Sequence, residues 1–208
     1  MKKILFLIFL GWATNTVAET FDDFFIAVKL NDTRTLTKLL QKGFPPDAAN
    51  ATGDTALTTA AREGSTEALN LLLSAGANPN TPNQSGETAL MLAAYNGYPA
   101  IAKALLAKGA EVNSPGWTAL IYAAYQGQTE IAELLLTHGA LINAASPSGM
   151  TALMVAAQGG HKDTIKLLLA KKADPNLKNA RQETALHIAL AKNNTQIGDL
   201  LKLAGAKE

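Results

Sequence analysis

The chain has 208 residues, of which 18 are lysine or arginine and 17 are aspartate or glutamate, and it contains no cysteine. This near-neutral balance gives no electrostatic basis for binding nucleic acid or an anionic membrane surface. The lack of cysteine excludes thiol catalysis, thiolate metal sites and disulfides, so the stability of the fold has to come from packing.

The first 18 residues have the pattern of a secretory signal peptide. Two lysines are followed by an unbroken apolar run at residues 4–13, and Thr16 and Ala18 are small residues placed three and one before a cut. Ten helical residues reach about 15 Å, roughly half the hydrocarbon thickness, which argues against a retained membrane anchor. We expect cleavage after Ala18 and export to the periplasm of a bacterium. The mature chain would start at Glu19 with 16 basic and 17 acidic residues.

Two amphipathic helices are predicted directly after the signal. In the first, apolar side chains recur at helical spacing in Phe21, Phe24, Phe25 and Val28, and the second contains Leu36, Leu39 and Leu40. An aromatic cluster of this kind could line a ligand site, but such spacing more often marks core packing. We therefore expect these side chains to pack together at one end of the fold.

A repeat of about 33 residues fills the remainder of the chain. The tripeptide Thr-Ala-Leu recurs at intervals of 33, 30, 33 and 33 residues, starting at Thr55, Thr88, Thr118, Thr151 and Thr184. A second series of turn positions has the same period and the same short interval: Gly43, Gly76, Gly109, Gly139, Lys172 and Gly205. Two series that share one period and one shortened step indicate a stack of similar units.

The stretch 53–85 illustrates the structure that each unit predicts. Thr55 is placed to cap a first helix, whose small residues would let the next unit stack closely. Ser65 is placed to cap a second helix, in which an apolar stripe is formed by Ala68, Leu71 and Leu72. The segment 78–86 is rich in turn formers and predicts a projecting hairpin.

With its repeated T-x-L-x-x-A core, the sequence from about Phe21 onward resembles the ankyrin-repeat family. The resemblance implies an all-α ankyrin-repeat solenoid in one domain, built of stacked helix-turn-helix units with projecting β-hairpin loops. The expected units are an N-terminal cap at 19–52, four repeats at 53–85, 86–115, 116–148 and 149–181, and a C-terminal cap with a polar second helix at 182–208.

Three features depart from the family's usual pattern. Its histidine near the start of the first helix appears here only as His187. Lys172 occupies a position that favours glycine and a positive φ, which predicts a cost on the order of 1 kcal/mol. The segment 113–117 is three residues short, which predicts a truncated hairpin and a gap in the row of loop tips beside Trp117.

Catalytic and metal-binding patterns are missing from the sequence. His138, His161 and His187 lie at unrelated positions within their units and lack the spacing of a metal site. The position of His161, at the head of a second helix, is one where the family often has a histidine that makes a structural hydrogen bond. The serines have no nucleophile motif around them, and the glycines follow the structural period. We therefore expect no enzyme activity, no metal and no cofactor.

The resemblance also implies a binding face. In the family, protein partners bind the concave face, which is formed by the residue before the capping threonine, the end of the first helix and the loop tips. The candidate partner-binding residues are then Trp117, Tyr95, Tyr125, Arg62, Asn96, Gln126, Glu87 and Met150. Exposed aromatic rings carry much of the binding energy of interfaces, so Tyr95, Tyr125 and Trp117 are the central candidates. Tyr122, one turn before Tyr125, is expected in the core.

These patterns favour a monomeric, non-catalytic protein-binding module of the periplasm. The role would be that of an inhibitor, an immunity factor, an adaptor or a stress-protection factor, a range suggested by exported proteins that look similar. The alternative is a small-ligand binder or an enzyme that uses the concave groove, with Asp54 and Glu87 as candidate acidic groups.

Overall fold

The computed structural model describes residues 14–207 and the side chains from Thr20 onward. Residues 1–13, which hold most of the predicted signal peptide, lie outside the described residues, so cleavage after Ala18 stays a prediction. The described chain forms twelve helices: α1 (Thr14–Lys29), α2 (Thr33–Gln41), α3 (Ala56–Glu63), α4 (Thr66–Ser74), α5 (Ala89–Asn96), α6 (Pro99–Ala107), α7 (Ala119–Tyr125), α8 (Thr129–Thr137), α9 (Ala152–Gly159), α10 (Lys162–Ala170), α11 (Ala185–Ala191) and α12 (Thr195–Leu203).

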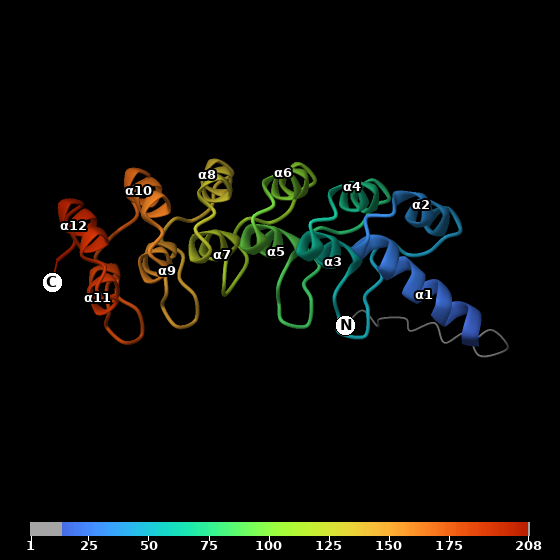
Figure 1. The fold of residues 1–208 in the computed structure, drawn as a ribbon, viewed down its shortest axis with the longest axis horizontal. Helices are drawn as coiled ribbons and strands as arrows, with labels where there is room; N and C mark the ends of the chain where they lie inside the picture. The colour runs from blue at the N-terminus through green and yellow to red at the C-terminus, as the bar shows by residue number, and fades with distance from the viewer. Residues whose placement is uncertain (1–13, 208) are drawn as a thin grey trace, which may run out of the picture.

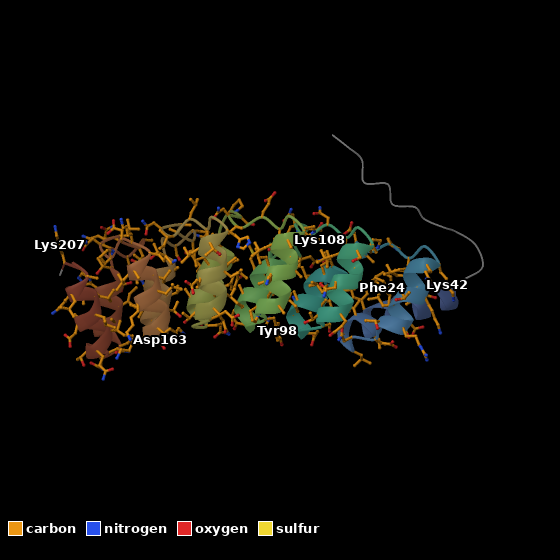
Figure 2. All side chains as sticks on the ribbon, turned by 90° about the horizontal axis from the view of Figure 1, so that it is seen from above. Phe24, Lys42, Tyr98, Lys108, Asp163 and Lys207 are labelled. Carbon is orange, nitrogen blue, oxygen red and sulfur yellow. The ribbon has the colours of Figure 1, made fainter. Side chains whose placement is uncertain are left out.

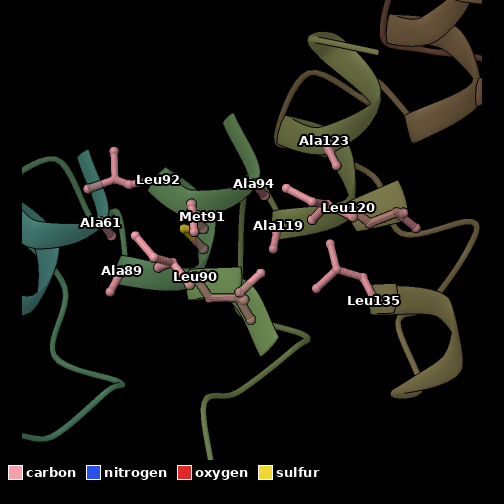
Figure 3. Packing of buried hydrophobic residues seen from close by; sticks show 14 of the residues in the cluster. Ala61, Ala89, Leu90, Met91, Leu92, Ala94, Ala119, Leu120, Ala123 and Leu135 are labelled. Atoms are coloured by element: carbon pink, nitrogen blue, oxygen red, sulfur yellow. The ribbon is translucent and has the colours of Figure 1, made fainter. Parts of the chain in front are cut away.

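The helices stack in two rows, with the odd-numbered helices in one row and the even-numbered helices in the other (Figure 1). Each odd helix packs on the even helix of its own unit and on the odd helix of the next unit. From α3 onward the odd helices are short and rich in alanine, and Ala60, Ala61, Ala93 and Ala94 are completely buried. Because these side chains are small, neighbouring backbones approach closely and the units share one continuous core (Figure 3).

The even helices stand side by side when the molecule is seen from above (Figure 2). Each buries two large aliphatic side chains about one turn apart, as Ile101 and Leu105 do in α6. In α4 the fully buried pair is Leu69 and Leu72. The sequence analysis assigned Leu71 to this stripe, but Leu71 is only partly buried because α4 turns Leu69 toward the core instead.

The first unit is held by aromatic packing, as predicted. Phe24 and Val28 of α1 are completely buried, and Leu36 of α2 packs with them. The ring of Phe44 stacks on Phe24 with a centroid distance of 4.3 Å. The phenylalanines of α1 therefore belong to the core at this end of the stack.

Threonine capping is confirmed in the four repeats and in the C-terminal cap. The hydroxyl of Thr55 accepts a hydrogen bond from the Thr58 N–H, and the other four threonines accept the equivalent bond. Ser65 is the N-cap residue of α4, as predicted, but its side chain makes no capping hydrogen bond. Its hydroxyl donates instead to the carbonyl oxygen of Lys29, because the start of α4 lies against the end of α1 in the preceding unit.

The loops between units are tight turns with isolated β-bridges, and no β-strand is formed within residues 14–207. In four of them a backbone N–H donates to the carbonyl oxygen four residues later, in the pairs Asn50–Asp54, Asn83–Glu87, Ser146–Met150 and Asn179–Glu183. Within the described residues the predicted hairpins therefore consist of the turn alone, without paired strands.

The third loop, 113–117, is the short one. A Cβ atom added to Gly53 or Gly149 would meet the following loop, whereas a Cβ atom added to Gly86 would find nothing within 4 Å. The loop that follows Gly86 is the shortened one, so the expected gap is present. We call this gap, between the loop tips at 83–87 and 146–150, the notch.

The last unit has two residues, Leu190 and Gly198, that differ from the repeat pattern and pack against each other. Leu190 occupies a position that holds a completely buried alanine in the four preceding units, namely Ala61, Ala94, Ala124 and Ala157. It is 41% exposed and lies over Gly198 of α12, where a Cβ atom would sit 3.1 Å from a methyl carbon of Leu190. The leucine therefore covers its own unit from the side on which the other units stack.

The backbone of Lys172 has a φ of 68°, which confirms the predicted positive φ. Gln182 also occupies a repeated glycine position, with a φ of 61°, and the sequence analysis did not single it out. We expect Lys172→Gly to raise the free energy of unfolding by about 0.5–1 kcal/mol, because glycine adopts this conformation without strain. Urea unfolding monitored by circular dichroism would measure the change.

Lys171→Gly provides the matched control. Lys171 has a φ of −86°, which any residue adopts, so glycine there only adds freedom to the unfolded chain. We expect this variant to lose about 0.5–1 kcal/mol. Equal effects of the two substitutions would show that the backbone conformation of Lys172 carries no cost.

Candidate protein-binding face

The eight predicted binding residues lie at two repeated positions. Five are at or next to the C-terminal ends of odd helices: Arg62, Tyr95, Asn96, Tyr125 and Gln126. Three directly precede a capping threonine: Glu87, Trp117 and Met150. We call the surface formed by these two positions, in all five repeats, the inner face.

Tyr95 and Tyr125 come together on this face, as predicted. Tyr95 is the second-last residue of α5 and Tyr125 the last of α7, and these two helices pack against each other in neighbouring units. Their rings are 37% and 41% exposed and lie nearly parallel, with an interplanar angle of 15° and a centroid distance of 6.3 Å. Large exposed rings held this close are characteristic of binding surfaces.

Trp117 and Tyr122 complete the group. Trp117 is partly buried, and its ring lies 5.4 Å from that of Tyr122 and 6.1 Å from that of Tyr125. The prediction that Tyr122 belongs to the core is confirmed only in part, because Tyr122 packs against the core cluster without being fully buried in it. Tyr122 is only partly buried, because the first turn of α7 points its ring along the inner face to within 5.9 Å of Tyr95. We call Tyr95, Trp117, Tyr122 and Tyr125 the aromatic patch.

A carboxylate adjoins the aromatic patch. The Tyr122 hydroxyl donates to Oε1 of Glu87 over 3.1 Å, and the side-chain amide of Asn83 donates to Oε2 of Glu87 over 3.0 Å. Asn83 is buried, and its own amide oxygen accepts the backbone N–H of Glu87, so the loop tip fixes the carboxylate. Burial, followed by the negative charge of Glu87, raises the pKa of Tyr122 to about 12.

Asp54 occupies the position equivalent to Glu87 one unit earlier. It is only 8% exposed, and both of its carboxylate oxygens accept hydrogen bonds from the guanidinium of Arg62, over 2.6 and 2.8 Å. These bonds are the main reason that the pKa of Asp54 lies below its usual range. The Asn83 amide lies 3.1 Å from Asp54 and so bridges the two carboxylates. Asp54 and Glu87 are therefore neighbours, but Asp54 is already neutralised by Arg62.

Arg62→Gln should lower the free energy of unfolding at pH 7 by about 1.5 kcal/mol, since it leaves the Asp54 carboxylate without its cation. The folded-state pKa of Asp54 is depressed, so the pair stabilises the protein above the unfolded pKa of about 3.9. That contribution is lost as the pH falls through the folded pKa. The difference between variant and wild type should thus shrink between about pH 5 and pH 2, measured by urea unfolding at several pH values.

Lys171→Gln is the control for the charge change itself. Lys171 and Glu133 form an ion pair at 3.8 Å, with side chains 44% and 58% exposed. Such exposed pairs contribute about 0–1 kcal/mol. A loss for Arg62→Gln no larger than for this control, or one that does not change with pH, would contradict the assigned role of the Arg62–Asp54 pair.

The remaining predicted residues lie away from this network. The Asn96 amide donates to the carbonyl oxygen of Leu92 in its own helix, and Gln126 is an exposed cap at the end of α7. Met150 contacts the amide of Asn179 in the following loop and lines a hollow of about 160 Å³ with Gln158, Arg181, Glu183, Ile188, Ala191 and Lys192. This hollow is a second feature of the inner face.

The histidines serve the structure of the repeats. Nε2 of His161 lies 2.8 Å from the carbonyl oxygen of Tyr125, so a ring N–H ties the start of α10 to the end of α7. His187 lies against the hydroxyl of its capping threonine, Thr184, at 2.8 Å. Within the described residues no three His, Cys, Asp or Glu side chains are grouped to hold a metal. None of the helices in that part of the chain is long and apolar enough to cross a membrane.

Comparison with known proteins assigns the fold to a family. The sequence profile of the family described as ankyrin repeats (3 copies) matches residues 24–115, 66–146, 112–179 and 143–207. The chain belongs to the ankyrin-repeat family. No curated protein matches it in sequence. The crystal structure of the human ASB11 ankyrin repeat domain is similar, with a TM-score of 0.83 and 26% identity over 88% of this chain and 84% of that one.

The ankyrin-repeat solenoid predicted from the sequence is therefore confirmed. Ankyrin repeats are in general protein–protein interaction modules and act as non-catalytic scaffolds. In this ankyrin-repeat chain, the aromatic patch and Glu87 are the part of the inner face where exposed rings and a fixed charge lie together. The signal that points to Asn83 is its repetition as Asn179, which the sequence analysis did not use.

Proposed function

We propose that this ankyrin-repeat protein binds a partner protein through the aromatic patch on its inner face. The observation that carries the proposal is the pair of exposed, nearly parallel rings of Tyr95 and Tyr125, which contact the rings of Tyr122 and Trp117 respectively. Rings that are held rigidly lose little conformational entropy when a partner covers them, which is why tyrosine and tryptophan are enriched in interfaces.

The notch supports this location. At the notch the loop directly before Trp117 is three residues shorter than the others, and full-length loops project on both sides of it. A convex part of a partner would reach the aromatic patch through the notch with less obstruction than elsewhere along the stack. The partner would therefore cross the loop tips near residues 113–117.

We further propose that the protein acts in the periplasm, as an inhibitor, immunity factor, adaptor or stress-protection factor. The sequence of the first 18 residues supports export, and the aromatic core of the first unit starts at Phe21, beyond the predicted cut. A mature chain that begins at Glu19 would keep this core. Mass spectrometry of the protein from fractionated cells tests the proposal, and a retained Met1 in the membrane fraction would contradict it.

Tyr125→Ala and Trp117→Ala should each weaken partner binding by about 2 kcal/mol, which is roughly 30-fold in Kd. The partner is first captured from a periplasmic extract on the immobilised protein, and the purified pair is then titrated by calorimetry. A thermal melt of each variant separates binding from folding. Tyr125 is 41% exposed, so its removal should leave the melting temperature nearly unchanged.

Leu203→Ala is the matched control. Leu203 is a large exposed side chain, 87% accessible, at the far end of the stack in α12. It should bind the partner like wild type. If Tyr125→Ala and Trp117→Ala also bind like wild type, the aromatic patch is not the interface.

A further inference from the structure

We propose that the aromatic patch and Glu87 together form a receptor for a basic side chain of the partner, arginine in preference to lysine. This inference rests on the proposed protein-binding function and adds the chemistry that the surface recognises.

An acidic residue precedes the capping threonine in three units, as Asp54, Glu87 and Glu183. Asp54 is paired with Arg62 of its own unit at 2.6 Å. Glu183 is paired with Arg181 of its own loop at 3.1 Å, and the Asn179 amide donates to the same carboxylate. Two of the three carboxylates are thus neutralised within the chain.

Glu87 also accepts a side-chain amide, but it has no cation in direct contact, because Arg62 is bonded to Asp54 and acts on Glu87 only through space. Asn83 donates to Glu87 as Asn179 does to Glu183, but the residue equivalent to Arg181 is Ser85. Among residues 20–207 no lysine, arginine or histidine lies within ion-pair distance of Glu87. Each of its oxygens accepts one neutral hydrogen bond and keeps the capacity for another. A partly buried carboxylate in this state attracts a cation.

The aromatic patch, which contacts Glu87 through Tyr122, favours the same kind of ligand. The face of an aromatic ring attracts a cation that lies within about 6 Å of its centroid. Tyr95 and Tyr125 present nearly parallel rings, while Tyr122 and Trp117 stand almost perpendicular to them, at 84° and 79°. A planar guanidinium stacks on such a face and also forms two parallel hydrogen bonds to a carboxylate, which an ammonium does not.

The first test uses peptides that differ only in charge. The peptide Ac-Gly-Ser-Arg-Ser-Gly-amide is compared with the same peptide containing citrulline, which is neutral and nearly isosteric. The chain has two tryptophans, Trp12 and Trp117, so in the full chain with Trp12→Phe the fluorescence reports on the aromatic patch alone. We expect the arginine peptide to bind about tenfold more tightly than the citrulline peptide, and the lysine peptide to lie between them. Equal binding of the arginine and citrulline peptides would overturn the inference.

Two variants test the role of Glu87. Glu87→Gln should abolish the preference for arginine over citrulline, while Glu183→Gln, the equivalent change in the last repeat, should leave it intact. Ser85→Arg restores the residue that pairs with the acid in the last repeat, at an exposed loop position that tolerates change. The new guanidinium should pair with Glu87 and so abolish the preference for arginine over citrulline, although Glu87 itself is unchanged. A preference that persists in both Glu87→Gln and Ser85→Arg would contradict the inference.

Failure of this inference is distinguishable from failure of the proposed function. Suppose that a captured partner binds the Tyr125→Ala variant more weakly than wild type but binds the Glu87→Gln and Ser85→Arg variants like wild type. That result would confirm the interface and overturn the proposal that it receives a basic side chain. A partner that is indifferent to Tyr125→Ala would overturn both.

Discussion

Removal of residues from Gln182 onward should lower the free energy of unfolding on the order of 4 kcal/mol and make the shortened chain self-associate. The deletion takes away α11 and α12, with the buried side chains Leu186, Ile188, Ile197 and Leu201. α11 packs against α9, in which every residue from Ala152 to Ala157 is buried, so its loss uncovers an apolar surface. Stability in such a stack depends on the contacts between neighbouring units.

Urea unfolding gives the stability of the shortened chain, and light scattering gives its state of association. Leu203→Ala in the full chain is the control, because it removes the most exposed large apolar side chain of the same unit without disturbing its packing. It should unfold like wild type. A shortened chain that stays monomeric and equally stable would show that the last unit does not cap the stack.

Gly149→Ala should cost about 3 kcal/mol of stability. Gly149 has a φ of 77°, which costs a non-glycine residue about 1–2 kcal/mol. An added Cβ atom would lie 2.9 Å from the Asn179 Cα and 3.0 Å from the backbone nitrogen of Ala180. The Ala180 N–H donates to the Ser148 carbonyl oxygen over 3.0 Å, so the clash falls on the contact that joins these two loops. Displacing it adds about 1–3 kcal/mol.

Gly86→Ala separates the two causes. Gly86 has a φ of 78° at the equivalent position, but it faces the notch and has nothing within 4 Å of the added atom. This variant should therefore lose only about 1 kcal/mol, the cost of the backbone conformation. The difference between the two free energies of unfolding, measured in urea, gives the value of the contact between loops. Equal losses would mean that the loop at 179–183 moves away from the added atom without lowering the free energy of unfolding.

Features that repeat in every unit were predictable from the sequence. The Thr-Ala-Leu series located the first helices and their caps, and the glycine series located Lys172 as a residue with positive φ. The helical spacing of Phe24 and Val28 identified the core of the first unit. These features depend on local geometry and on a constant period, both of which are visible in a single sequence.

Contacts between units were the part that sequence analysis missed. Tyr122 donates to Glu87 across 35 residues, and Ser65 donates to Lys29 across 36. Such contacts depend on the rotation of one unit relative to the next, which a repeat period does not specify. Tyr122 was assigned to the core for this reason, although the prediction that Tyr95, Trp117 and Tyr125 lie together on one face was correct.

The pairing of Leu190 with Gly198 bears on how such an array lengthens by gene duplication. A copied internal unit brings an alanine to the joint between first helices, so it fits between existing units. A copy of the last unit placed behind the original would force a leucine into the joint where Ala61 and Ala157 have no exposed surface. Overfilling of this kind is destabilising. New units should therefore descend from the middle of the array, with the last unit carried along unchanged at its end.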